Sequence, residues 1–162
     1  MFSLGQLVLW LVPTSFYMYQ YILRVLPNIM AEDLQRHFSI RADQFSTLGT
    51  LFFCAYSLMQ LPLGFIVDRV STHKVILSSI CLCIFGMTIF CWSDNFSIAQ
   101  IGRFLSGAGA ASGLMCALKI ISSSFQSKLK SIFMGLTLCI GMIGAVLSSF
   151  LLEHIKKTLG WQ

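Results

Sequence analysis

Two arginines stand inside otherwise apolar stretches of the sequence, Arg24 near the end of the first stretch and Arg103 within the fourth. A charged side chain near the bilayer centre costs about 2.5 to 3.5 kcal/mol on insertion scales, so such residues usually face protein or a water-filled cavity. A guanidinium forms strong, charge-assisted hydrogen bonds with anions. The two arginines therefore predict a site within the membrane for a small polar or anionic solute.

Tyrosines and an asparagine share one helical face with Arg24. This row consists of Tyr17, Tyr21, Arg24 and Asn28, spaced i, i+4, i+7 and i+11. At about 100° per residue these side chains occupy a stripe roughly 60° wide. A similar row in the second apolar stretch consists of Gly49, Phe53, Tyr56, Gln60 and Gly64. We expect the two rows, together with Arg103, to line a shared aqueous cavity.

Arg24 has an alternative interpretation, and one further candidate has a geometric objection. Arg24 lies close to the end of its apolar stretch, so its guanidinium could instead reach the lipid headgroups while the tyrosines form an interfacial belt. Lys119 is a further candidate for the cavity, but on a straight helix it lies about 160° around the axis from Arg103. On such a helix the two side chains cannot share a narrow face.

Five apolar segments are long enough to position these side chains within a bilayer, which a helix of about 20 residues crosses. The sequence predicts spans at residues 4–26, 45–67, 74–93, 96–123 and 131–152, followed by a tail at 153–162. Backbone groups find no partner in lipid and the segments are apolar on every side, which indicates helices and not barrel strands. Short connections predict antiparallel neighbours. The expected fold is all-α: one polytopic helix bundle, forming a single membrane domain over residues 1–162.

The composition supports a membrane protein and argues against other classes. Hydrophobic residues make up 56% of the chain and charged residues 10%, far from a soluble average. The net charge is +5, but the basic residues are spread over loops and spans, so no nucleic acid is expected as a partner. No Asp, Glu or His lies within the spans, which argues against an intramembrane enzyme. The six cysteines form no CxxC pair, so neither a metal nor another cofactor is expected.

Small residues predict close helix packing in the fourth and fifth spans. The fourth contains the run SGAGAASG at residues 106–113, and the fifth has further glycines. Small side chains let another helix backbone approach closely within a membrane. The candidates for such packing are Gly107, Gly109, Gly113, Gly135, Gly141 and Gly144. A cavity shaped to the solute is the alternative role for these glycines.

The link between the second and third spans reads GFIVDRVSTHK over residues 64–74. It resembles the signature of the major facilitator superfamily of secondary transporters, approximately G-x-L-a-D-R-x-G-R-K, and it lies between the two spans where that family carries it. The motif residues here are Gly64, Asp68, Arg69, His73 and Lys74, while Ser71 and Thr72 depart from the pattern. The resemblance implies that the motif is a latch at the cytoplasmic face, which stabilises one state of the carrier.

Further matches to that family extend over nearly the whole chain. They comprise Tyr56, Gln60 and Pro62 in the second helix, Arg103, Gly107 and Gly109 in the fourth, and Gly160 with Trp161 before a sixth. Gly135 and Gly144 resemble the start of the antiporter signature. Ser148 and Ser149 replace its following glycine and proline, which favours uptake, as by a symporter, over antiport.

The resemblance implies alternating access around a site near the bilayer midplane, with the first and fourth helices as equivalents in an inverted repeat. It also implies a multi-pass protein of the bacterial inner membrane with a cytoplasmic N-terminus. Complete members have about twelve spans, so we expect a truncated carrier segment that is inactive alone. Its expected partners are the solute, the lipid bilayer, and a second transporter half or a second copy. The alternative is a non-transporting membrane subunit.

Overall fold

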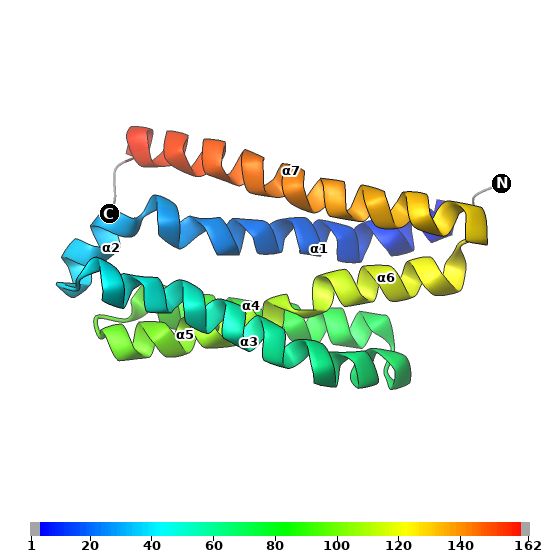
Figure 1. The fold of residues 1–162 in the computed structure, drawn as a ribbon, viewed down its shortest axis with the longest axis horizontal. Helices are drawn as coiled ribbons and strands as arrows, with labels where there is room; N and C mark the ends of the chain where they lie inside the picture. The colour runs from blue at the N-terminus through cyan, green and yellow to red at the C-terminus, as the bar shows by residue number, and fades with distance from the viewer. Residues whose placement is uncertain (1–3, 160–162) are drawn as a thin grey trace.

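A computed structural model describes residues 4–159, except for the side chains of residues 153 and 155–159. Within these residues the chain forms α-helices and no strand (Figure 1). The helices are α1 (Leu4–Ile29), α2 (Ala31–Phe38), α3 (Ala42–Arg69), α4 (Thr72–Trp92), α5 (Phe96–Ala110), α6 (Ser112–Ser124) and α7 (Ser127–Leu159). The expected all-α bundle is confirmed, and residues 160 and 161, which were matched to the family, lie outside the described part.

Four helical segments are long and apolar enough to cross a membrane: α3, α4, the α5–α6 segment Phe96–Ser124, and Ser127–Leu152 of α7. The remaining predicted span, the first in the sequence, is α1, which is not among these four; its 26 residues extend about 39 Å. It is less apolar because it carries buried polar residues, among them Thr14 and Gln20. Since α1 runs between α7 and the remaining helices (Figure 1), these polar groups face protein.

The helices pack as two related sets. In one set α5 lies along both α3 and α4, and in the other α1 lies along α7 and α6. In an inverted repeat, α1 would correspond to the α5–α6 segment and α3 would correspond to α7. The contact between α3 and α5 in one set should then have a counterpart in a contact between α7 and α1 in the other. Both contacts are present, as the inverted repeat implied by the resemblance requires.

The structure corrects three boundaries predicted from the sequence. The connection at residues 28–44 contains the short helix α2, which the sequence did not predict as a helix. Acidic Glu32 and Asp33 lie in its first turn and basic Arg36 and His37 in its last, an arrangement that complements the helix dipole. The fourth span is broken at Ala111, between α5 and α6. The predicted tail at 153–162 is helical as far as Leu159, so α7 extends beyond the apolar segment.

Glycines bring the helix backbones together, and one close approach involves a pair that sequence reasoning missed. A Cβ atom on Gly86 of α4 would lie 2.8 Å from the carbonyl oxygen of Gly102 in α5, and one on Gly102 would lie 2.7 Å from that of Gly86. Gly109 is enclosed in the same way by Ser79 and Cys83. Side-chain atoms cannot fit at these distances, so glycine is required for this close α4–α5 contact.

The other glycines predicted to serve packing differ in their surroundings. Gly107 lies against the backbone of Phe52 in α3, Gly144 against Met18 in α1, and Gly135 has nothing within 4 Å of an added Cβ. The described helices therefore give a packing reason for Gly107 and Gly144 and none for Gly135.

Candidate functional site

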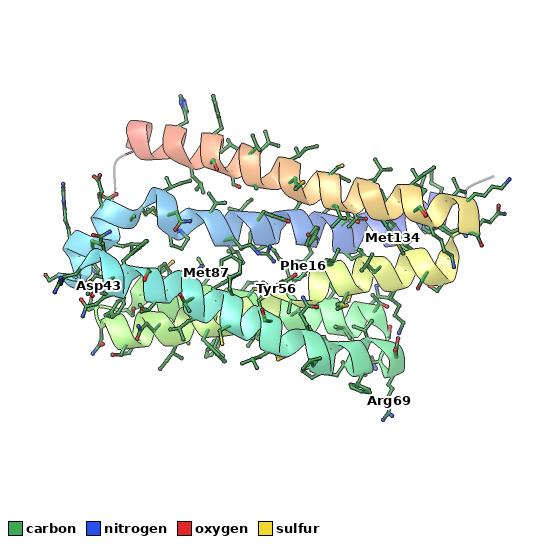
Figure 2. The ribbon with its side chains drawn as sticks, in the orientation of Figure 1. Phe16, Asp43, Tyr56, Arg69, Met87 and Met134 are labelled. Carbon is green, nitrogen blue, oxygen red and sulfur yellow. The ribbon has the colours of Figure 1, made fainter. Side chains whose placement is uncertain are left out.

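Arg24 lies among aromatic rings on adjacent helices α1 and α3. Its guanidinium carbon is 4.5 Å from the ring centroid of Tyr56, 4.9 Å from that of Tyr21 and 5.8 Å from that of Phe53. Tyr56 lies near the middle of the bundle (Figure 2). Cation–π contacts at these distances contribute about 0.5 to 2 kcal/mol each. The rings hold the guanidinium in place near the middle of the membrane-spanning bundle.

The hydrogen-bonding groups of Arg24 are not satisfied by these rings. Its Nε and Nη2 atoms are buried and have no hydrogen-bond partner among the described residues. An ion pair at the surface joins Arg41 and Asp43 at 3.6 Å and does not involve Arg24. Arg24 as a whole is half-buried, but a buried donor without an acceptor costs free energy. Arg24 therefore presents an uncompensated charge and free donors, which suit an anion.

Arg103 lies enclosed within the bundle. Its side chain is 1% exposed, its Nη1 donates to the carbonyl oxygen of Leu23 at 3.0 Å, and its guanidinium carbon lies 4.6 Å from the ring centroid of Phe52. Close packing of α5 against its neighbours encloses the side chain. Arg103 faces the interior of the bundle and binds the α1 backbone, and its Nε is buried without a hydrogen-bond partner among the described residues. A place for Arg103 in an aqueous cavity stays a prediction.

Tyr17 and Tyr21 link the site to α7. Their hydroxyl oxygens are 3.1 Å apart, and their rings meet edge to face with centroids 5.3 Å apart. A Cβ on Gly141 of α7 would lie 2.5 Å from Cε1 of Tyr17 and 2.7 Å from Cε2 of Tyr21. The bare backbone of Gly141 thus makes room for both rings. Tyr17 is buried, so its role here is to support Tyr21, which contacts Arg24.

Three other predicted site residues lie apart from this cluster or at its edge. Gln60 is half-buried on α3, one turn beyond Tyr56, and Asn28 is exposed at the end of α1. Asn28 therefore does not extend the buried stripe. Lys119 is half-buried on α6, beyond the break at Ala111. The angle of about 160° to Arg103 applies to an uninterrupted straight helix, and the regular helix is interrupted between the two residues.

Two buried polar residues were missed by the sequence reasoning. Gln20 is fully enclosed on α1, and Ser112 is fully enclosed at the start of α6. Both atoms of the Gln20 amide and the Ser112 hydroxyl lack a hydrogen-bond partner among the described residues. Gln20 precedes Arg24 by one helical turn, so the spacing that selected the tyrosines provided a signal for it. Ser112 lay in a run that we interpreted as packing.

The motif residues between α3 and α4 lie at one end of the bundle. Asp68, Arg69, His73 and Lys74 are exposed, and Figure 2 shows Arg69 at the end opposite Asp43. An added Cβ on Gly64 would meet nothing within 4 Å. This geometry leaves the charged motif accessible to a partner, while the latch itself stays a prediction.

Comparisons with known proteins agree with this architecture. The family model of the Major Facilitator Superfamily matches residues 7–162. The chain is 25% identical over 138 residues to the "Probable L-galactonate transporter" of Escherichia coli (strain K12). That match covers 80% of this chain but 28% of the relative, so the chain spans less than a third of the length of that protein. No solved structure shows a significant match.

Proposed function

Because the chain belongs to the Major Facilitator Superfamily, a family of membrane transporters, we propose that it forms a helical bundle of a secondary carrier that takes up a small anionic solute by alternating access. The protein is an integral, multi-pass membrane protein with several membrane-spanning helices. The finer proposals concern the solute, the direction of transport and the orientation in the membrane.

The observation that carries the proposal is the state of Arg24. Its buried Nε and Nη2 atoms have no partner among the described residues, and Tyr21 and Tyr56 hold its guanidinium from two helices. A carboxylate accepts two parallel hydrogen bonds from a guanidinium and neutralises its charge. A solute carboxylate would therefore supply both the charge and the acceptors that this residue lacks.

The name of the Escherichia coli relative suggests a class of solute for this chain. That name refers to L-galactonate, which is a carboxylate with hydroxyl groups along its carbon chain. We propose a small hydroxylated carboxylate for this chain as well, with Arg24 binding the carboxylate. Leu23 directly precedes Arg24, and Arg103 donates a hydrogen bond to its carbonyl oxygen. In this way Arg103 fixes the α1 backbone beside Arg24. Arg103 is accordingly a positioning residue in this proposal.

The proposal includes an orientation and a partner surface. The exposed charges of residues 68–74 face the cytoplasm, as does the N-terminus, and the membrane is the bacterial inner membrane. Large apolar side chains are exposed along α3 and α7, including Leu61, Phe65, Val146 and Phe150. A second bundle packs against these helices in the working carrier, and the isolated chain does not transport.

A non-transporting membrane subunit is the second candidate function. It is favoured by Gly49 and Gly64 of α3 and Gly135 of α7, since none of these has a neighbour within 4 Å of an added Cβ. Bare helix faces of this kind suit association with another membrane protein. This alternative requires no solute at Arg24, which makes the two functions separable by experiment.

Solute binding by the full-length protein in lipid nanodiscs distinguishes the carrier from the non-transporting subunit. Arg24→Gln should weaken the binding of L-galactonate at least about tenfold, because a charge-assisted hydrogen bond contributes about 1.5 to 3 kcal/mol. Arg36→Gln, on the exposed face of α2, is the matched control and should bind as the unaltered protein does. Equal carboxylate binding in both variants would remove Arg24 from the site and favour the subunit function.

A further inference from the structure

Uncharged polar groups are buried without partners at Gln20, one helical turn before Arg24 on α1, and at Ser112 on α6. The amide of Gln20 has neither its donor nor its acceptor satisfied among the described residues, and neither is the hydroxyl of Ser112. Both side chains are 0% exposed. A buried polar group with no hydrogen bond destabilises a fold, and an apolar residue of similar size would avoid that cost. The presence of two such groups indicates that something else uses them.

The two groups lie beside the break in the fourth span. A Cβ on Gly113 would overlap Nε2 of Gln20 and would lie 3.1 Å from its Cδ, so the amide of Gln20 sits directly against the backbone next to Ser112. The helix is interrupted one residue before Ser112, at Ala111. Interrupted helices in membrane carriers place polar groups where a ligand binds.

The position of Gln20 relative to Arg24 defines the shape of a ligand. Four residues along α1 separate them, which corresponds to a rise of about 6 Å and a rotation of about 40°, so both lie on one face. A ligand with a carboxylate at Arg24 and a polar group about 6 Å away spans both. The carbon chain of a six-carbon acid is long enough to do so.

We infer that Gln20 and Ser112 form a subsite for the hydroxyl groups of the solute. The inference rests on the proposed function, because Arg24 is taken to bind the carboxylate of the same molecule. A hydroxyl both donates and accepts hydrogen bonds, as do an amide side chain and a serine, so the three match without any charge. The solute class is therefore a carboxylate with a hydroxyl near the middle of its chain.

The enclosure of the subsite fits a carrier that changes conformation. Gln20 and Ser112 are sealed between α1 and α6 in the present state, so a solute reaches them when α6 moves away from α1. Bending of the span at Ala111, between α5 and α6, would let α6 move while α5 stays in place against α4. In that movement the unsatisfied groups gain solute hydroxyls as partners.

Three probes test the subsite in the full-length protein in lipid nanodiscs: L-galactonate, hexanoate and galactitol. The first has a carboxylate and hydroxyls, the second only the carboxylate, and the third only hydroxyls. Gln20→Leu and Ser112→Ala should each weaken L-galactonate and galactitol binding at least about tenfold and leave hexanoate unchanged. Thr14→Val is the control, since it removes a buried hydroxyl that bonds within α1 to Trp10, and should change none of the three.

The outcomes separate this inference from the proposed function. Galactitol binding that depends on Gln20, with no carboxylate binding by the unaltered protein, would overturn the anionic solute and retain the subsite. Equal losses for L-galactonate and hexanoate, or no loss for either, would overturn the subsite and leave Gln20 as a packing residue. Binding of none of the probes would overturn both. If Gln20→Leu does not fold, Ser112→Ala decides by the same criteria.

Discussion

Arg103 donates its Nη1 hydrogen to the carbonyl oxygen of Leu23, at 3.0 Å, and Pro27 lies four residues further along α1. In a regular helix that carbonyl would accept the N–H of residue 27, which proline lacks. The arginine of α5 therefore supplies the donor that the proline of α1 cannot. A charged residue in this membrane bundle is used to complete a helix backbone, one residue before Arg24.

A double-mutant cycle tests this relationship. Arg103→Met should destabilise the protein by about 1.5 to 3 kcal/mol, because it leaves a buried carbonyl unpaired. In a Pro27→Ala background the N–H of residue 27 can bond to Leu23, so the same substitution should cost much less. Thermal unfolding of the four proteins in detergent provides the measurement. Additive effects of the two substitutions would show that the arginine and the proline are independent.

Glycines of α7 should differ sharply in their tolerance of a methyl group. Gly141→Ala should destabilise the isolated chain by about 1 to 3 kcal/mol, because the new Cβ meets the rings of Tyr17 and Tyr21. Gly135→Ala meets nothing within 4 Å and should stabilise it by about 0.5 to 1 kcal/mol. Unfolding midpoints of the two variants are compared directly. A destabilised Gly135→Ala chain would mean that its face is already occupied, as in a self-associated form.

The orientation is testable with single cysteines introduced at Lys128 and Asp94, in a background without native cysteines. Lys128 lies at the start of α7 and Asp94 between α4 and α5, at opposite ends of the bundle. An impermeant maleimide added to whole cells should label position 94 and not position 128, because the motif end is proposed to be cytoplasmic. The reverse labelling pattern would invert the topology.

Liposomes that contain only this chain should show no solute flux above that of empty vesicles. Alternating access requires two bundles that move against each other around the solute, whereas here the apolar surfaces of α3 and α7 are exposed. The assay uses L-galactonate, amino acids and peptides under an imposed proton or sodium gradient. Saturable uptake that depends on the gradient would show that a single bundle, or an assembly of its copies, is sufficient.

Length and hydrophobicity were enough to predict the helical spans, because lipid leaves the backbone few alternatives. The short helix α2 was missed since its eight residues are mostly polar and charged. The break at Ala111 was missed since a run of Ala, Gly and Ser is compatible with both a continuous and an interrupted helix. The break has no signal in hydrophobicity, whereas the spacing of Ala31, Leu34 and Phe38 on one face was an available signal for α2.

The two arginines show why sites are harder to predict than spans. Arg24 and Arg103 have similar apolar sequence surroundings, and both lie beside aromatic rings with Nε unpaired among the described residues. They differ in that Nη1 of Arg103 donates to the backbone of another helix, whereas Nη2 of Arg24 is buried without a partner. The difference depends on which helices touch, and residues distant in the sequence determine that. The tyrosine spacing around Arg24 was informative because it lies within one helix, where the geometry is known in advance.

The contact between α4 and α5 has a consequence for the unfolding of the bundle. Gly86 and Gly102 bring these backbones together, and Cys83 donates from its thiol to the carbonyl oxygen of Ser106 across the same contact. Neither helix can loosen without exposing the other, so their amides should exchange with deuterium together and more slowly than those of α6. The pair would then be the last region of the chain to open, as one cooperative unit.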